Sequence, residues 1–105
     1  MRKFYITFIF LFISLNAHAC TTDGIYPDKS NGCTPGSVYE EVTPEQICTP
    51  GYSKTVRNTT PAMKREVYEK YNIPVKDRKL HVLDHLISLQ LGGRDSIDNL
   101  FPQRK

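Results

Sequence analysis

Residues 81–103 read HVLDHLISLQLGGRDSIDNLFPQ, and this stretch decides the fold. Its pattern predicts a strand or extended segment over 79–91, a turn at Gly92-Gly93, and a second short extended segment over 99–102.

Asp84 and His85 are the titratable pair of the first segment, and apolar residues flank them on both sides. A carboxylate is a hard ligand for a divalent ion, and neutral imidazole accepts a proton near physiological pH. Neighbours in a regular strand point to opposite faces, so the backbone must distort for both to reach one ion. The alternative is an exposed aspartate beside a half-buried histidine that bonds a backbone carbonyl.

Helix signals lie upstream of this stretch. Thr43 predicts a cap, followed by Pro44 and by Gln46 at the capping-box position, and Thr60-Pro61 repeats the start. The second start opens a helix over 61–71 whose apolar stripe is Met63, Val67 and Tyr71. Residues 52–58 alternate weakly and predict a strand or an extended basic arm, whereas residues 20–42 are loop-rich.

The N-terminus predicts a secretory signal peptide over residues 1–19. Arg2-Lys3 forms a basic start, an apolar stretch of twelve residues follows, and Ala17-His18-Ala19 forms a small-x-small cleavage site. We expect export to the periplasm or beyond the cell, with no membrane contact after cleavage. An uncleaved N-terminal anchor is the alternative.

Three cysteines remain after position 19: Cys20, Cys33 and Cys48. An oxidising compartment favours one disulfide and leaves one thiol over. The sequence leaves all three pairings open, and the shared loop-rich segment favours Cys20 with Cys33. The odd thiol then implies a disulfide-linked partner chain, a free thiol, or a missing fourth cysteine.

Charge is divided unevenly along the chain, although the formal net charge is only +3. Residues 20–50 carry one lysine against five acidic residues, whereas residues 51–105 carry eleven Lys and Arg against six Asp and Glu. The basic half contains Asp84 and His85. A polyanion such as DNA or RNA would bind this half. A solvated basic surface with no such partner is the alternative.

The quoted stretch resembles the signature of HNH (ββα-metal) endonucleases. The similarity is specific over 84–103, where Asp-His-Leu-Ile precedes Leu-Gly-Gly and Asn-Leu-Phe-Pro-Gln follows. A looser similarity to small exported members of the family extends back to Cys33-Thr34-Pro35-Gly36 and residues 47–57. It therefore covers most of the chain after the signal peptide.

The resemblance implies a role for each matching residue. His85 would be the general base that takes a proton from the attacking water, and Asp84 the metal-binding carboxylate. Asn99 would hold the loop and orient the histidine. The implied cofactor is a divalent ion, Mg²⁺ first, with Mn²⁺, Ni²⁺ or Zn²⁺ as alternatives. Charge and position add three phosphate contacts: Lys54, Arg57 and Arg94.

Two departures from the family pattern bear on activity. Ser88 and Gln90 stand where similar proteins have proline and glutamate. The sequence ends two residues after Gln103, where the family has a further helix with a metal-binding histidine. The expected fold is therefore a small single α+β domain with one main helix and an incomplete HNH-like motif over 43–105, preceded by a loop-rich, disulfide-bonded segment over 20–42.

The expected function is metal-dependent endonucleolytic hydrolysis of DNA or RNA phosphodiesters with little sequence specificity. Two alternatives remain open. One is a catalytically inactive HNH-like protein that binds nucleic acid, and the other is a small exported interaction domain held together by a disulfide.

Overall fold

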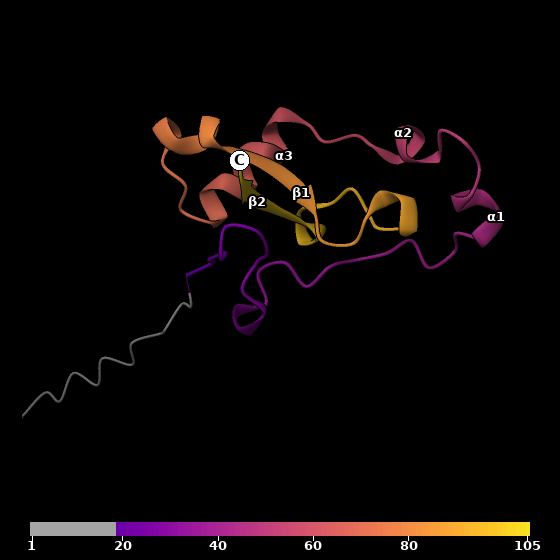
Figure 1. The fold of residues 1–105 in the computed structure, drawn as a ribbon, viewed down its shortest axis with the longest axis horizontal. Coiled ribbons are helices and arrows are strands. Elements are labelled where there is room, and N and C mark those ends of the chain that lie inside the picture. The colour runs from indigo at the N-terminus through magenta and orange to yellow at the C-terminus, as the bar shows by residue number, and fades with distance from the viewer. Residues whose placement is uncertain (1–18) are drawn as a thin grey trace, which may run out of the picture.

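A computed structural model of the protein describes residues 19–105, and its centre is a two-stranded antiparallel sheet (Figure 1). Strand β1 (His81–His85) pairs with β2 (Leu100–Arg104), with His85 opposite Leu100 and His81 opposite Arg104. The main helix, α3 (Pro61–Lys70), packs against β2. This arrangement confirms the α+β class. The predicted signal peptide lies almost entirely outside the described residues.

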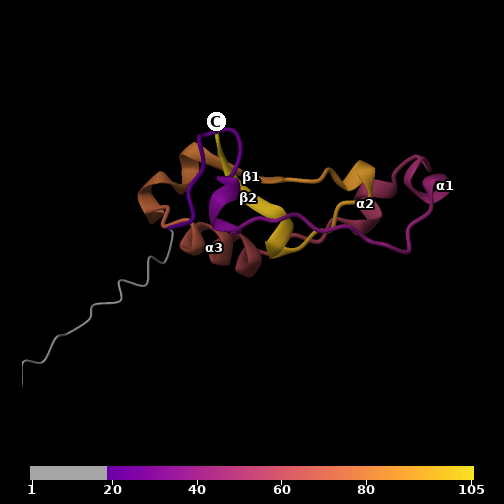
Figure 2. The ribbon, with the colours of Figure 1, turned by 90° about the horizontal axis from the view of Figure 1, so that it is seen from below.

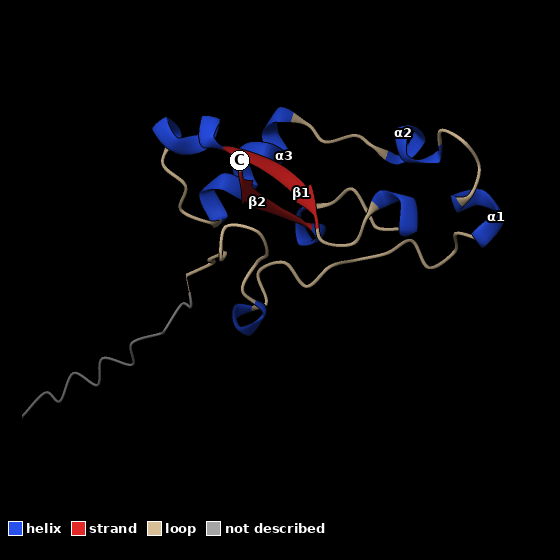
Figure 3. Ribbon diagram, viewed as in Figure 1, coloured by secondary structure: helices blue, strands red, loops and turns tan. Residues whose placement is uncertain are grey.

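The remaining elements are short and are joined by long loops (Figure 3). Helices α1 and α2 lie toward one end of the molecule, away from the C-terminal end of β2 (Figures 1 and 2). Within residues 19–105 no helix is both long and apolar enough to cross a membrane. The bounds are Pro44–Ile47 for α1 and Tyr52–Val56 for α2, with 3₁₀ turns at Lys29–Asn31, Val75–Leu80, Leu89–Leu91 and Ile97–Asn99.

Both predicted helix starts are confirmed. The Thr43 hydroxyl accepts a hydrogen bond from the Gln46 N–H, and the Gln46 side chain accepts one from the Thr43 N–H, which completes the capping box. At α3 the Thr60 hydroxyl accepts from the Met63 N–H. These bonds satisfy N–H groups that have no partner inside the helix, so local sequence alone fixes where each helix begins.

The core lies between α3 and the sheet. Val67 from α3 and Tyr71, the residue that caps its C-terminal end, pack with Leu100 and Phe101 from β2, and Met63 joins them at the edge of the cluster. The predicted apolar stripe of α3 is therefore the buried face. Each fully buried aliphatic or aromatic side chain contributes about 1.5–3 kcal/mol relative to an exposed one.

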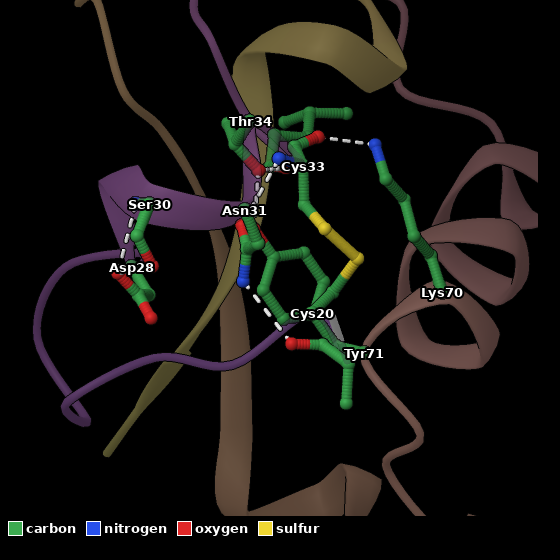
Figure 4. The surroundings of a disulfide bond; sticks show 10 residues. Cys20, Asp28, Ser30, Asn31, Cys33, Thr34, Lys70 and Tyr71 are labelled. Carbon is green, nitrogen blue, oxygen red and sulfur yellow. Dashed lines mark hydrogen bonds between the residues drawn. A yellow bond between two sulfur atoms is a disulfide. The ribbon is translucent and has the colours of Figure 1, made fainter. Parts of the chain in front are cut away.

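A disulfide joins Cys20 to Cys33 and holds the N-terminal segment beside α3 (Figure 4). The favoured pairing is confirmed, and Cys48 is free and exposed. The segment is tied down further because the Thr34 hydroxyl donates to the Leu100 carbonyl at 3.0 Å and the Lys70 ammonium donates to the Cys33 carbonyl. Residues 20–34 are therefore loop-rich but packed against the domain.

The sequence prediction was wrong for residues 52–58, which form helix α2 over Tyr52–Val56 and not a strand or arm. Gly51 adopts a positive φ of 84° just before the helix, and the Arg57 N–H bonds the Ser53 carbonyl, so a local turn outweighs the weak alternation.

The predicted strand over 79–91 was too long, because only His81–His85 is strand. The strand stops there because Asn99 makes the hydrogen bonds to the backbone that follows His85. Its carbonyl accepts from the Leu86 N–H at 2.9 Å, and its side chain bonds Ile87.

Candidate active site

His85 is the last residue of β1, and its ring is held by a buried carboxylate. Its Nε2 lies 2.8 Å from Asp95 Oδ1, and the two side chains are 9% and 2% exposed. His85 lies opposite Leu100, on the sheet face that also carries Leu83 and His81. The pair joins the end of a strand to the loop that returns to β2.

Asp95 accepts hydrogen bonds on both of its oxygens. Oδ1 accepts from the Thr59 hydroxyl at 2.7 Å as well as facing His85, and Oδ2 accepts from the Asn58 N–H. Burial by itself would raise the pKa of Asp95, but the hydrogen bonds from His85, Thr59 and Asn58 lower it below its ordinary value. The carboxylate is therefore ionised near neutral pH and acts only as an acceptor.

Asn99 closes the loop between the strands and is fully buried. Its Oδ1 accepts from the Ile87 N–H at 2.9 Å, and its Nδ2 donates to the carbonyls of Ile87 at 3.0 Å and Arg94 at 2.7 Å. One side chain thus fixes the backbone on both sides of the loop, next to His85 at one end and next to Asp95 at the other. This is the loop-holding position that the sequence assigned to Asn99.

The loop between β1 and β2 also requires a glycine at position 93. A Cβ built on Gly93 would lie 1.9 Å from the Ile87 carbonyl oxygen, closer than any side chain tolerates. The Gly93 N–H donates to the Ser88 carbonyl at 3.0 Å. The turn predicted at Gly92-Gly93 is therefore present, and Gly93 is the residue of the pair that leaves no room for a side chain.

Asp84 points differently from its neighbour. Its side chain is exposed, and Oδ1 accepts the backbone N–H of His85 at 2.8 Å, whereas the His85 ring bonds Asp95. Burial alternates along β1, as strand geometry requires. Asp84 and His85 nevertheless line one cavity, so a bound phosphate could touch both.

Two open cavities flank His85. The helix-side cavity, of about 550 Å³, lies between α3 and β1 and is lined by Lys64, Tyr68, His81 and Leu83 among others. The loop-side cavity, of about 610 Å³, is lined by Asp84, Ser53, residues 86–91 and Tyr26. His85 and Arg57 line both cavities, so the imidazole lies where the two cavities adjoin, and a permanently charged side chain faces the same space.

The predicted phosphate contacts separate in space. Arg57 lies at the junction just described, but neither Lys54 nor Arg94 lines either cavity. Arg94 donates from Nε to the Val38 carbonyl at 3.0 Å, and its guanidinium lies 4.9 Å from the centre of the Tyr39 ring. Lys64, on α3, supplies a second cation to the helix-side cavity.

Asp95, Thr59 and Asn58 were missed by the sequence reasoning. Asp95 lies in an irregular loop, and its partners at 58 and 59 precede a helix, so no strand or helix period relates them to His85. The available signal was an acidic residue two positions after Gly93, which could have been paired with the histidine ten positions earlier.

Asp84 is the carboxylate that the resemblance implies as the metal ligand. Over residues 19–105 no cluster of three or more acidic, histidine or cysteine side chains could hold an ion. Mg²⁺ commonly uses one or two carboxylates, with water and substrate phosphate completing its shell. One free carboxylate oxygen in a cavity fits that ion, whereas Zn²⁺ requires three or four protein ligands.

Comparisons with protein-family models, with curated proteins and with solved structures find no match to this chain. Functional inference therefore rests on the geometry around His85 and on the resemblance carried by residues 84–103.

Proposed function

We propose that this protein is a metal-dependent, HNH-type endonuclease that hydrolyses phosphodiester bonds in DNA or RNA with little sequence specificity. The observation that carries the proposal is the His85 imidazole, held by Asp95 at the junction of two cavities that both include Arg57. A base, an anion-binding cation and open space on both sides are what hydrolysis inside a polymer requires.

His85 acts in this proposal as the general base. Its ring takes a proton from the water that attacks phosphorus, a contribution of about 10²- to 10⁴-fold to the rate. Asn99 keeps the loop closed, so the ring and its carboxylate partner stay in register while the substrate binds.

Arg57 and Lys64 bind the phosphates. Arginine pairs with phosphate through two parallel N–H groups, and Lys64 adds a point charge along the helix-side cavity. Backbone contacts of this kind do not read base edges, which accounts for low sequence specificity.

Asp84 holds the divalent ion in this proposal, with the substrate phosphate and water completing the shell. When bound, Mg²⁺ supplies Lewis-acid stabilisation of the charge that develops on the phosphate oxygens. A site with one protein carboxylate binds the ion weakly in the absence of substrate, so activity should depend on millimolar-range free metal and not on a tightly held ion.

We further propose that β1, the crossing loop and β2 form the two-stranded part of a ββα-metal motif. The sharp turn closed by Asn99 and the position of His85 at the strand end support this assignment. The Cys20–Cys33 disulfide supports the proposed export, because disulfides persist in oxidising compartments such as the periplasm or the medium.

A plasmid-nicking assay with Mg²⁺, Mn²⁺, Ni²⁺ or Zn²⁺ tests the function, with single-stranded RNA as a second substrate. His85→Ala should lower the rate by about 10²-fold or more. His81→Ala is the comparison variant: His81 lies on the same strand face and also lines the helix-side cavity, but it bonds the Asp77 carbonyl at 2.9 Å and not Asp95, so its loss should lower the rate far less than the loss of His85.

Equal cleavage by the protein and by His85→Ala contradicts the proposal, as does the absence of cleavage with every metal. If cleavage is absent, a salt-dependent gel shift would identify an inactive nucleic-acid-binding protein. No shift at low salt would favour the exported interaction domain, with the exposed Cys48 available to a partner chain.

A further inference from the structure

We propose that Asp95 is a positioning residue that fixes neutral His85 in the Nε2–H tautomer, so that Nδ1 is the atom that accepts the proton. The inference rests on the proposed function only for the identity of the proton donor, an attacking water. The tautomer itself is a property of the protein without substrate.

The hydrogen bonds around Asp95 determine which ring nitrogen of His85 carries the proton. Both Asp95 oxygens already accept from groups that only donate or are oriented to donate, namely the Asn58 N–H and the Thr59 hydroxyl. An ionised carboxylate has no proton to give, so the contact at 2.8 Å requires a proton on His85 Nε2. Among residues 19–105, His85 Nδ1 has no hydrogen-bond partner and is free to act as a base.

Asp95 also positions the anion-binding side of the site. Asn58 and Thr59 belong to the linker between α2 and α3, and Arg57 is the residue just before them. The same carboxylate therefore anchors the base from β1 and the linker that presents Arg57 to both cavities. Because the Asp95 side chain is 2% exposed, water cannot replace these bonds at low cost.

An asparagine at position 95 cannot reproduce this arrangement. Its amide has one acceptor oxygen, and the Asn58 N–H and a protonated His85 Nε2 both need one, on opposite sides of the group. If the amide oxygen faces the Asn58 N–H, the amide NH₂ faces His85 Nε2. That nitrogen must then be unprotonated in order to accept the hydrogen bond. The imidazole proton moves to Nδ1, and the free base is lost although the side chain has nearly the same size.

The experiment is ¹⁵N-detected NMR of the histidine ring in the full chain, at a pH where the imidazole is neutral. The protein should show His85 in the Nε2–H form, and Asp95→Asn should shift it to Nδ1–H. Asp98→Asn is the matched control, because Asp98 lies three residues away and its Oδ1 accepts from the Ser37 and Ser96 hydroxyls, which an amide oxygen also satisfies. That variant should keep the Nε2–H form.

Nicking rates of the same three proteins give the second readout. Asp95→Asn should lose about 10²- to 10⁴-fold in rate, and Asp98→Asn should stay within about twofold of the unmodified protein. A loss of rate with an unchanged tautomer would be a structural effect and would overturn the inference.

An Nδ1–H tautomer in the unmodified protein also overturns it, and this measurement stands even if Asp95→Asn does not fold. An inactive protein with the Nε2–H tautomer contradicts the proposed nuclease function and supports the role of Asp95. The two failures are therefore distinguishable.

Discussion

Two regions of the molecule differ in how many large side chains they bury. One contains the sheet, α3 and the disulfide, and the other is the lobe formed by α1, α2 and the turn Leu89–Leu91 (Figures 1 and 2). The first half buries a connected cluster that includes Val67, Leu100 and Phe101. In the lobe, Leu89 is the buried large side chain, while Leu91 is 71% exposed. His85 and Asp95 lie where the two regions meet.

The comparison indicates how the site residues are held in place in so small a domain. His85 lies at the end of a strand in the sheet half, and the loop-side cavity next to it is bounded by the lobe. In the lobe, α2 packs against the turn Leu89–Leu91 beside that cavity. Asp95 bonds the Asn58 N–H in the segment between α2 and α3, and Asn99 bonds the Arg94 carbonyl in the loop before β2. Stability should therefore depend mainly on the sheet half.

Phe101→Ala should have the largest effect on stability. The side chain is 1% exposed, and its removal leaves a cavity in the core, so the free energy of unfolding should fall by about 3–5 kcal/mol. Leu91→Ala, an exposed change in the lobe, should stay within about 0.5 kcal/mol. Urea titration followed by circular dichroism measures both, and equal losses would show that the regions are equally important to stability.

Cys20→Ser tests how much the disulfide stabilises the sheet half. Opening the Cys20–Cys33 bond, which spans 13 positions, should cost about 2–4 kcal/mol, because the unfolded chain regains conformational freedom. Cys48→Ser is the control, since Cys48 is free and exposed, and should leave the midpoint nearly unchanged. A larger effect at Cys48 would mean that its thiol forms a bond in the protein as purified.

Of the three destabilising changes, Asn99→Ala should have the smallest effect on overall stability and the most local one. It leaves the Ile87 N–H and the Arg94 carbonyl without partners, at a cost of about 1–3 kcal/mol. Hydrogen exchange should quicken over residues 86–98 before it does in β1 and β2. Asn58→Ala keeps the backbone N–H that Asp95 accepts and should change neither. Uniform acceleration across the sheet would contradict this division.

Much of the fold was predictable because its signals are local. The caps at Thr43 and Thr60 act within three residues, and the stripe Met63, Val67 and Tyr71 lies on one face of a helix by its spacing alone. The errors were at residues 52–58 and at the end of β1, where a turn glycine and a contact from Asn99 decide the backbone.

Periodicity and neighbouring residue types were enough to predict the α+β class and the main helix, and the resemblance over 84–103 pointed to His85 and Asn99. Only the folded structure shows that Asp95 holds His85 and that Arg57, unlike Lys54 and Arg94, lines the same cavities as His85. It also fixed the pairing of Cys20 with Cys33. The physical reason is that these contacts join loop residues separated by ten or more positions, where no repeating geometry relates sequence distance to distance in space.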